Sequence, residues 1–330
     1  MKAIVQERYG PIEEVLELRD LQDPAPGPGQ VLVRAAAASV HIGDCHQIRG
    51  IPRLFRPLVY GTRRPRMRIP GTDVAGVVET VGPDVTRFTP GDEVLGGGSG
   101  AFAMRVVANE GALVRKPVDL GFAEASAVGV SALTALQALR DHGRVKSGQR
   151  VVVVGASGGV GTFAVQIAKA MGAEVTGVCS TRNVELVRSI GADHVIDYTV
   201  EDFTAGTARY DLVFDNVGKQ SLASLRRPLT PSGRLLPNGV QVGAWVGGLG
   251  RTAATALSSI VVRRQARPFV SMPKLQDLEE VLAMVTSGRV RPVIDLTVPL
   301  AQAAEAVAHV ASGHTRGTSV ITIADDGVPA

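Results

Sequence analysis

Short apolar runs and helical periodicities alternate through the second half of this chain. Val151 to Val154 is a β-branched run of the kind that forms a strand buried on both faces of a parallel sheet. From Val160 to Met171 the apolar residues recur at the spacing of one helix face, and Glu174 to Val178 is a further strand. The pattern predicts strand, turn, helix and strand in succession, which is a βαβ unit.

The same alternation continues beyond this unit. Helices are predicted over 184–190 and 221–229, and the predicted strands are His194 to Ile196, Tyr210 to Phe214, Gly233 to Leu236 and Phe269 to Ser271. Strands that alternate with helices indicate a doubly wound parallel sheet. Ligands of such sheets bind beyond the carboxyl ends of the strands.

The first 120 residues follow a different pattern. Short strands, punctuated by glycine and proline, are predicted over 2–6, 15–19, 31–38 and 69–83 and from residue 91. An alanine-rich helical stretch at 122–139 then leads into the parallel sheet. Helices over 275–287 and 301–311 and a strand over 319–323 are expected to rejoin the β-rich part. The predicted fold class is α/β, with a β-rich domain of residues 1–120 and 272–330 and a doubly wound domain of residues 121–271.

A glycine-rich turn joins the first strand of the βαβ unit to its helix. Glycines 155, 158, 159 and 161 leave out side chains where backbone approaches a pyrophosphate and where the helix packs on the strand. The helix N-terminus directs free N–H groups at the phosphates. A tight turn in an unrelated α/β protein is the alternative. The predicted cofactor contacts in this turn are Ala156, Ser157, Gly158, Gly159 and Val160.

The end of the second strand indicates which dinucleotide binds. An acidic residue there would bind the ribose 2′-hydroxyl of NAD(H). Ser180, Arg182 and Asn183 offer donors and a positive charge instead, which suit a 2′-phosphate. The sequence therefore favours NADP(H).

Composition narrows the class of protein. Of 330 residues, 45% are hydrophobic and 20% charged, and the net charge is +4, so the chain is globular and has no strong nucleic-acid signature. Two cysteines, Cys45 and Cys179, give no disulfide framework and fit a reducing compartment. The N-terminus lacks an apolar signal core, and the apolar stretch from Gly243 to Val262 contains an arginine and several glycines. We expect a cytoplasmic protein with no membrane or nucleic-acid partner.

Candidate chemistry gathers after the third predicted strand. His41, Asp44, Cys45 and His46 stand within a few residues of one another. They are followed by seven arginines, at positions 49, 53, 56, 63, 64, 66 and 68. This stretch is either a solvated loop or a basic rim that attracts an anionic substrate. Tyr60, inside it, is a possible acid.

Four motifs carry a family resemblance: SVHIGD at 39–44, IPGTDVAGVVETVG at 69–82, GASGGVG at 155–161 and GADHVIDY at 191–198. With them the chain resembles the medium-chain dehydrogenase/reductase superfamily, in its zinc-independent quinone oxidoreductase branch. The resemblance implies a GroES-like substrate domain formed by both chain ends, an inserted Rossmann domain, a homodimer, and a quinone or enone substrate.

The resemblance also implies roles for single residues. It assigns Gly158, Gly159 and Val160 to the pyrophosphate and Thr134 to the nicotinamide. Tyr198 and Ser180 are assigned to the 2′-phosphate, and Asn216 and Asn238 to the lining of the ring. Many relatives have lysine where this chain has Asn183, so Arg182 is the expected charge partner, displaced by one residue.

At the positions of the metal ligands, this chain differs from the zinc-dependent members of the superfamily that it resembles. Those relatives place a cysteine at the position of His41 and a His-Glu pair at Thr72 and Asp73, so no metal site is expected. Quinone oxidoreductases usually carry asparagine at the position of His41. An imidazole there could hydrogen-bond a substrate oxygen, supply a proton, or only fill space. Asp44 could orient its neighbours or take part in catalysis.

Three hypotheses follow. The first is an NADPH-dependent reductase that passes hydride to a quinone or to the β-carbon of an α,β-unsaturated carbonyl. The second is an alcohol or ketone dehydrogenase of the same superfamily that retains a metal. The third is a catalytically silent protein that binds NADPH or nucleic acid.

Overall fold

The computed structural model describes residues 1–238 and 269–323, which pack as two compact units. Unit 1 comprises Met1–Ser131, Pro273–Thr286 and the described residues from Pro292 onward. Unit 2 comprises the described residues of Ala132–Met272 together with Ser287–Arg291. Unit 1 extends to Ser131, since helix α3 (Phe122–Ala127) packs on its strands.

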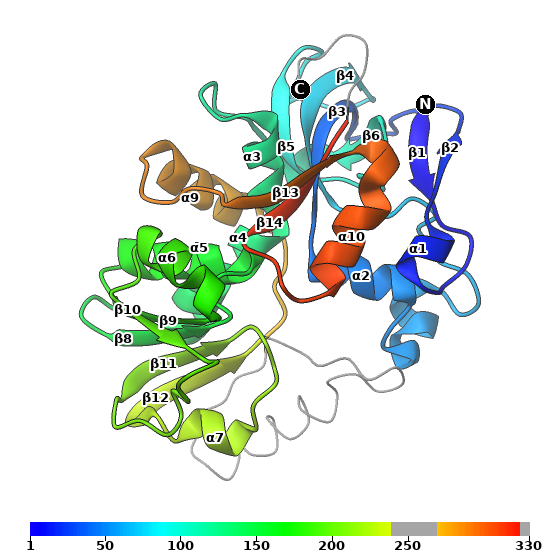
Figure 1. The fold of residues 1–330 in the computed structure, drawn as a ribbon. Helices are drawn as coiled ribbons and strands as arrows, with labels where there is room; N and C mark the ends of the chain where they lie inside the picture. The colour runs from blue at the N-terminus through cyan, green and yellow to red at the C-terminus, as the bar shows by residue number, and fades with distance from the viewer. Residues whose placement is uncertain (239–268, 324–330) are drawn as a thin grey trace. The chain divides into compact units, whose positions relative to one another are not determined.

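Unit 1 is built on a seven-stranded sheet (Figure 1). The strand order is β13-β14-β3-β4-β5-β7, and β6 pairs with β3. These strands are β3 (Gln30–Val40), β4 (Asp73–Val81), β5 (Glu93–Gly97), β6 (Arg105–Asn109), β7 (Leu113–Arg115), β13 (Ile294–Pro299) and β14 (Thr318–Thr322). A separate antiparallel pair joins β1 (Lys2–Val5) to β2 (Glu17–Asp20). The two chain ends therefore share one β-rich unit, since β14 pairs with β3.

The helices of unit 1 pack on its strands and on one another. They are α1 (Ile12–Val15), α2 (Ile42–Arg49), α3, α9 (Leu275–Thr286) and α10 (Ala303–Ala311), with short helical turns η1 (Arg53–Phe55), η2 (Arg56–Tyr60), η3 (Glu110–Ala112) and η6 (Leu300–Gln302). Helix α10 packs on β13, β14 and α2 (Figure 1). Its inward face is Ala303, Ala306 and Val307, at the i, i+3, i+4 spacing of an apolar stripe.

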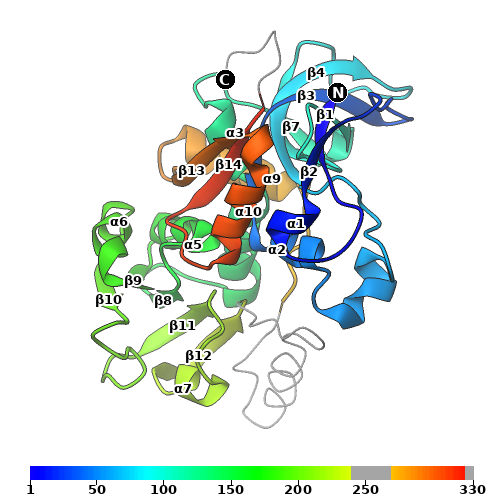
Figure 2. The same cartoon turned by 45° about the vertical axis from the view of Figure 1, so that its right-hand side comes forward.

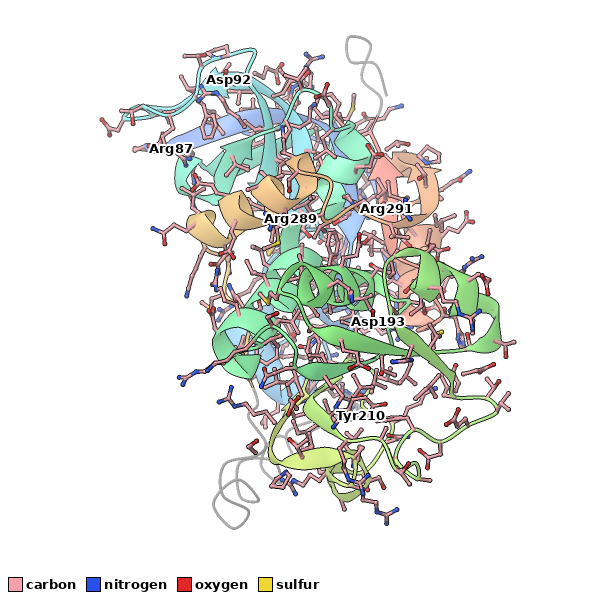
Figure 3. All side chains as sticks on the ribbon, turned by 90° about the vertical axis from the view of Figure 1, so that its left-hand side faces the viewer. Arg87, Asp92, Asp193, Tyr210, Arg289 and Arg291 are labelled. Carbon is pink, nitrogen blue, oxygen red and sulfur yellow. The ribbon has the colours of Figure 1, made fainter. Side chains whose placement is uncertain are left out.

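Unit 2 contains the predicted parallel sheet. Its strands are β8 (Arg150–Val154), β9 (Glu174–Cys179), β10 (His194–Asp197), β11 (Tyr210–Asp215) and β12 (Leu229–Pro237), in the order β10-β9-β8-β11-β12. All four pairings are parallel. The strand order reverses at β8, which is the switch point where doubly wound folds bind dinucleotides. Figure 3 labels Tyr210, the first residue of β11, and Asp193, just before β10.

Helices cover both faces of this sheet. Helices α5 (Gly159–Ala170) and α6 (Val184–Ser189) lie on one face, and α7 (Leu222–Arg226) lies on the other (Figures 1 and 2). Helix α4 (Gly129–Gln137) continues into the turn η4 (Ala138–Gly143), and η5 (Thr181–Asn183) follows β9. The predicted doubly wound sheet is confirmed.

The prediction of a strand over Phe269–Ser271 is wrong, because none of these residues is in a strand. The side chain of Gln137 takes the place of a neighbouring strand. Its Oε1 accepts from the Ser271 hydroxyl at 3.0 Å and from the Met272 N–H at 3.1 Å, and its Nε2 donates to the Met272 carbonyl at 2.6 Å. One buried side-chain amide thus pairs with both backbone polar groups of Met272, the residue that follows the predicted strand.

The described ranges leave out residues that one earlier expectation concerns. These residues are the stretch from Gly243 to Val262, which we expect not to span a membrane. Within residues 1–238 and 269–323, no helix has the length and hydropathy that crossing a bilayer requires.

Candidate active site and dinucleotide site

His41 stands at the N-terminus of α2, where it caps the helix. Its ring Nδ1 accepts from the Gly43 backbone N–H at 3.1 Å, and the Asp44 carboxylate accepts from the His41 backbone N–H at 2.9 Å. This reciprocal arrangement is a capping box, which satisfies two of the donors that a helix start leaves unpaired. The SVHIGD motif therefore fixes the ring before any ligand binds.

The other ring nitrogen of His41 points at a second motif. Nε2 lies 2.8 Å from Thr72 Oγ1 and 3.4 Å from Asp44 Oδ2. Because Nδ1 accepts a hydrogen bond, the proton of the neutral imidazole is on Nε2, which donates to Thr72. The Thr72 hydroxyl in turn donates to Asp44 Oδ1 at 3.3 Å. His41, Thr72 and Asp44 thus form a closed ring of hydrogen bonds, which we call the His41 network.

The Asp44 carboxylate of this network is removed from water. Its side chain is 2% exposed, whereas that of His41 is 15% exposed. Burial raises the pKa of Asp44, and the hydrogen bonds from the His41 backbone and Thr72, together with the positive charge that His41 carries when protonated, oppose that rise. The network therefore has one buried end at Asp44 and one partly accessible end at the imidazole.

A second buried carboxylate, Asp73, lies beside the network. Its Oδ2 accepts from the Ser39 hydroxyl at 3.2 Å and from the Val130 N–H, at the start of α4, at 2.9 Å. Burial raises the pKa of Asp73 to about 6. Sequence reasoning treated Thr72 and Asp73 only as lost zinc ligands. The signal for their role was the polar pair itself, because Asp73 is the buried first residue of β4 and Thr72 directly precedes it.

The other candidates near His41 do not join the network. Cys45 is fully buried, its thiol donates to the Val307 carbonyl at 3.4 Å, and burial raises its pKa to about 12. Burial lowers the pKa of His46 to about 4, so this imidazole stays neutral. Tyr60 ends η2, where its carbonyl accepts from the Tyr9 hydroxyl at 2.7 Å. Among the described residues, no hydrogen bond joins Tyr60 to the His41 network.

These side chains do not fit a zinc ion. A catalytic zinc needs three protein ligands that converge on it. Both ring nitrogens of His41 are already engaged, and the Cys45 thiol is directed to a backbone carbonyl. A search of the described part of the chain finds no group of three or more His, Cys, Asp and Glu side chains that could hold a metal ion.

The candidate dinucleotide site of unit 2 starts at the glycine turn after β8. Gly155 has a φ of +77°, which favours glycine. A Cβ on Gly161 would lie 2.0 Å from the Gly155 carbonyl oxygen, so α5 packs directly on the turn. Helix α5 begins at Gly159, and its N-cap residue Gly158 offers no side-chain cap, so the first N–H groups of the helix can bind an anion.

Three predicted residues meet beside this turn. Asn183 Nδ2 donates to Ser157 Oγ at 2.9 Å and to Ser180 Oγ at 3.3 Å, although the chain separates them by 26 and 3 positions. Asn183 is 4% exposed, and its Oδ1 is buried without a hydrogen-bond partner. A buried polar atom without a partner is costly, so this group fits a site completed by a ligand.

Two further predicted residues pair at the ends of β11 and β12. Asn238 Nδ2 donates to Asn216 Oδ1 at 2.8 Å, and the Asn216 N–H donates to the carbonyl of Val154, the last residue of β8. The Asn216 Nδ2 is buried and lacks a partner. Asp215, fully buried, accepts from the N–H groups of Val217 and Gly218 and holds this turn in place. The pair therefore lies at the carboxyl edge, next to the glycine turn.

The remaining cofactor candidates are spread over the same unit. The Tyr198 N–H donates to the Cys179 carbonyl at 3.0 Å, which places Tyr198 beside the end of β9 with its side chain exposed. Arg182 is exposed in η5. Thr134 is buried in α4. Ala156 is fully buried in the turn, and Val160 lies in the first turn of α5.

Comparison with known proteins agrees with this architecture. The family model for an alcohol dehydrogenase GroES-like domain matches residues 27–118, and the model for a zinc-binding dehydrogenase matches residues 190–321. The first match lies within unit 1, and the second spans residues of both units.

Individual relatives cover almost the whole chain. A chloroplast envelope quinone oxidoreductase homolog of Arabidopsis thaliana is 33% identical over 97% of this chain and 98% of its own length. The solved quinone oxidoreductase from Coxiella burnetii is 28% identical, with a TM-score of 0.86 over 98% of this chain and 99% of that one. A mycobacterial protein solved in complex with NADPH is 26% identical, with a TM-score of 0.79 over 98% and 99% of the two chains. The chain therefore belongs to the medium-chain dehydrogenase/reductase superfamily, as a nicotinamide-dependent oxidoreductase of its quinone oxidoreductase branch.

Proposed function

We propose that this protein is an NADPH-dependent reductase that transfers hydride to a quinone or to the β-carbon of an enone, without zinc. The observation that carries the proposal is the His41 network. It holds an imidazole N–H ready to hydrogen-bond an oxygen on which negative charge develops. The names of the quinone oxidoreductase relatives support the substrate class.

His41 acts as a hydrogen-bond donor in this proposal. A neutral imidazole does not readily give up its last ring proton, so Nε2–H stabilises the developing oxyanion without transferring the proton. Thr72 holds Nε2–H at rest and is displaced by the substrate oxygen. Asp44, whose carboxylate accepts from Thr72 and from the His41 backbone, fixes both partners.

The residues that would hold the cofactor are those of the glycine turn and the strand ends. Gly158, Gly159 and the first N–H groups of α5 would bind the pyrophosphate. The unpartnered Asn183 Oδ1 and Asn216 Nδ2 would each gain a hydrogen bond. Bound NADPH supplies the hydride.

The preference for the 2′-phosphate rests on the end of β9. Ser180 and Arg182 follow that strand, and residues 180–184 include no acidic residue. Asp197 ends the neighbouring strand opposite Cys179, but its carboxylate accepts from the Thr199 N–H at 2.9 Å and hydroxyl at 2.7 Å. With Asp197 engaged, the positive charge of Arg182 favours NADPH over NADH.

Among the described residues no set of side chains fits a catalytic metal, which supports the proposed substrate class. Without a Lewis acid, an isolated ketone or alcohol oxygen is poorly activated. A conjugated acceptor spreads the incoming charge over its own π-system, so oriented binding and one hydrogen bond can be enough. Quinones and α,β-unsaturated carbonyls meet this requirement.

The test is NADPH oxidation with a panel of quinones and enones, alongside zinc analysis of the purified protein. The proposal expects turnover with at least one acceptor and a lower kcat for His41→Ala. Stoichiometric zinc would favour the alcohol or ketone dehydrogenase. NADPH binding without turnover of any acceptor would favour a silent binding protein. We also propose a homodimer located in the cytoplasm, which light scattering and cell fractionation test.

A further inference from the structure

The segment between Asp44 and Asp73 has a one-sided charge. It holds no acidic residue and seven arginines. The exposed ones, which with Leu54 and Val59 we call the arginine surface, are Arg49, Arg53, Arg63, Arg64, Arg66 and Arg68. Arg68 forms an ion pair with Glu7, and Arg66 donates to the Pro57 carbonyl at 3.1 Å. The remaining excess of positive charge faces solvent and attracts anions.

The backbone of this segment is held in a defined shape. The Tyr9 hydroxyl lies 2.7 Å from the carbonyl oxygens of Tyr60 and Gly61. The seventh arginine, Arg56, stacks its guanidinium 4.1 Å from the centre of the Tyr9 ring and donates to the Gly50 carbonyl at 2.8 Å. Tyr9 and Arg56 therefore form a clamp inside unit 1, and the exposed arginines project from a preformed surface. Figure 2 turns the region that follows α2 toward the viewer.

Two aliphatic side chains project among these charges. Leu54 is 58% exposed and Val59 is 57% exposed, each within one helical turn, η1 or η2. Exposed aliphatic side chains do not improve the solvation of a charged surface. Arginines interspersed with exposed aliphatic groups are typical of surfaces that lie at the interface of an anionic bilayer, where the arginines pair with headgroups and the apolar groups enter the acyl boundary.

We propose that the arginine surface docks this protein on membranes that contain anionic phospholipid. The expectation of no membrane partner concerned spanning and signal segments, and peripheral docking needs neither. A nucleic-acid surface would add exposed aromatic side chains for base stacking, whereas Leu54 and Val59, the exposed apolar side chains that the structure describes on the arginine surface, are aliphatic. The proposal does not depend on the reaction or the cofactor.

Vesicle sedimentation with the full-length protein tests the proposal. The probes are phosphatidylcholine vesicles with and without about 30% phosphatidylglycerol. Binding is expected only with the anionic lipid and is expected to fall as salt is raised. An exposed arginine near an anionic surface contributes about a fivefold gain in partitioning, so Arg49→Ser, Arg63→Ser and Arg64→Ser together should lower binding on the order of 100-fold.

A charge-matched control separates a local surface from overall charge. Arg188, Arg227 and Arg289 are exposed arginines of unit 2, and Figure 3 labels Arg289. Their joint substitution by serine changes the net charge equally and should leave vesicle binding unchanged. Leu54→Ser with Val59→Ser should weaken the binding that remains at high salt. Unchanged thermal unfolding temperatures establish that each variant is folded.

Several results would overturn the proposal. One is wild-type protein that does not sediment with anionic vesicles, and another is equal loss of binding in the control triple variant. A third is displacement of the protein from the vesicles by single-stranded RNA. A fourth is a change in molar mass by light scattering when Leu54 and Val59 are replaced, with vesicle binding unaffected, because a second copy of the chain would then cover this face.

Discussion

His41 and Thr72 are joined by a hydrogen bond of 2.8 Å between Nε2 and Oγ1, across 31 positions of the chain. The Gly43 N–H donates to the other ring nitrogen, Nδ1. In the neutral imidazole the proton is therefore on Nε2, which donates to Thr72 Oγ1. The donor is therefore oriented before a substrate arrives. A preorganised donor stabilises developing charge without the cost of reorientation.

Thr72→Val should lower kcat. Valine keeps the shape of threonine but removes the oxygen that holds Nε2–H, so we expect kcat to fall about tenfold. The affinity for NADPH, measured by calorimetry, should stay unchanged. Thr72→Ser keeps the hydroxyl and should retain most of the activity. Equal kcat values for the valine and serine variants would exclude a role for this hydrogen bond.

Gly161→Ala should weaken dinucleotide binding. The added Cβ would lie 2.0 Å from the Gly155 carbonyl oxygen, so α5 must move away from the turn. We expect at least a tenfold rise in the Kd of NADPH, measured by calorimetry. Gly111→Ala is the matched control, since a Cβ at Gly111 meets no atom within 4 Å. An unchanged Kd for the Gly161 variant would place the pyrophosphate elsewhere.

Arg182→Ala should reduce the preference for NADPH over NADH. A charge-assisted hydrogen bond to the 2′-phosphate is worth about 1.5–3 kcal/mol, or roughly 10- to 100-fold in kcat/KM. The kcat/KM for NADH should change little. Arg209→Ala, at another exposed arginine of unit 2, should leave the ratio as it is. A ratio that is also unchanged in the Arg182 variant would show that this side chain does not select the cofactor.

Asp73→Asn should change how stability depends on pH. Burial raises the pKa of Asp73 from 3.8 to about 6, so the fold favours its protonated form. The contribution of the wild-type residue is full below about pH 4 and is lost as pH rises through 6. Relative to wild type, the asparagine variant should gain roughly 3 kcal/mol of unfolding free energy between pH 4 and pH 8.

Asp92 provides the control of opposite sign. Hydrogen bonds from Thr89 and the neighbouring Arg115 lower the pKa of Asp92, which Figure 3 labels on the surface of unit 1. Its contribution is present at neutral pH and is lost on acidification, so Asp92→Asn should lose stability relative to wild type as pH rises above 4. Parallel urea titrations at several pH values measure both effects. The same slope in both variants would contradict the assignment.

Much of the fold follows from the sequence because periodicity is local. The strand, glycine turn and helix from β8 to α5 lie where the pattern predicts them, since the apolar spacing and the glycines act within a few residues. The meeting of Ser157 with Asn183 also follows, because the carboxyl ends of neighbouring parallel strands share one edge.

The His41 network depends on long-range register, which the sequence does not display. Strands β3 and β4 place Ser39 opposite Asp73, but the pairing shifts twice, between Leu32 and Val33 and between Ala35 and Ala37. Each irregularity changes which residues face each other, and its position is set by packing in the whole sheet. For the same reason the pattern did not reveal that Gln137 replaces a strand partner for Ser271 and Met272.

The most direct measurement of the central claim is the rate of NADPH oxidation with quinones and enones after exhaustive dialysis against a chelator. The account predicts that the metal-free protein turns over at least one of these acceptors and that His41→Ala lowers kcat while NADPH still binds. It would be contradicted by bound NADPH that reduces none of them, or by activity that dialysis abolishes and zinc restores.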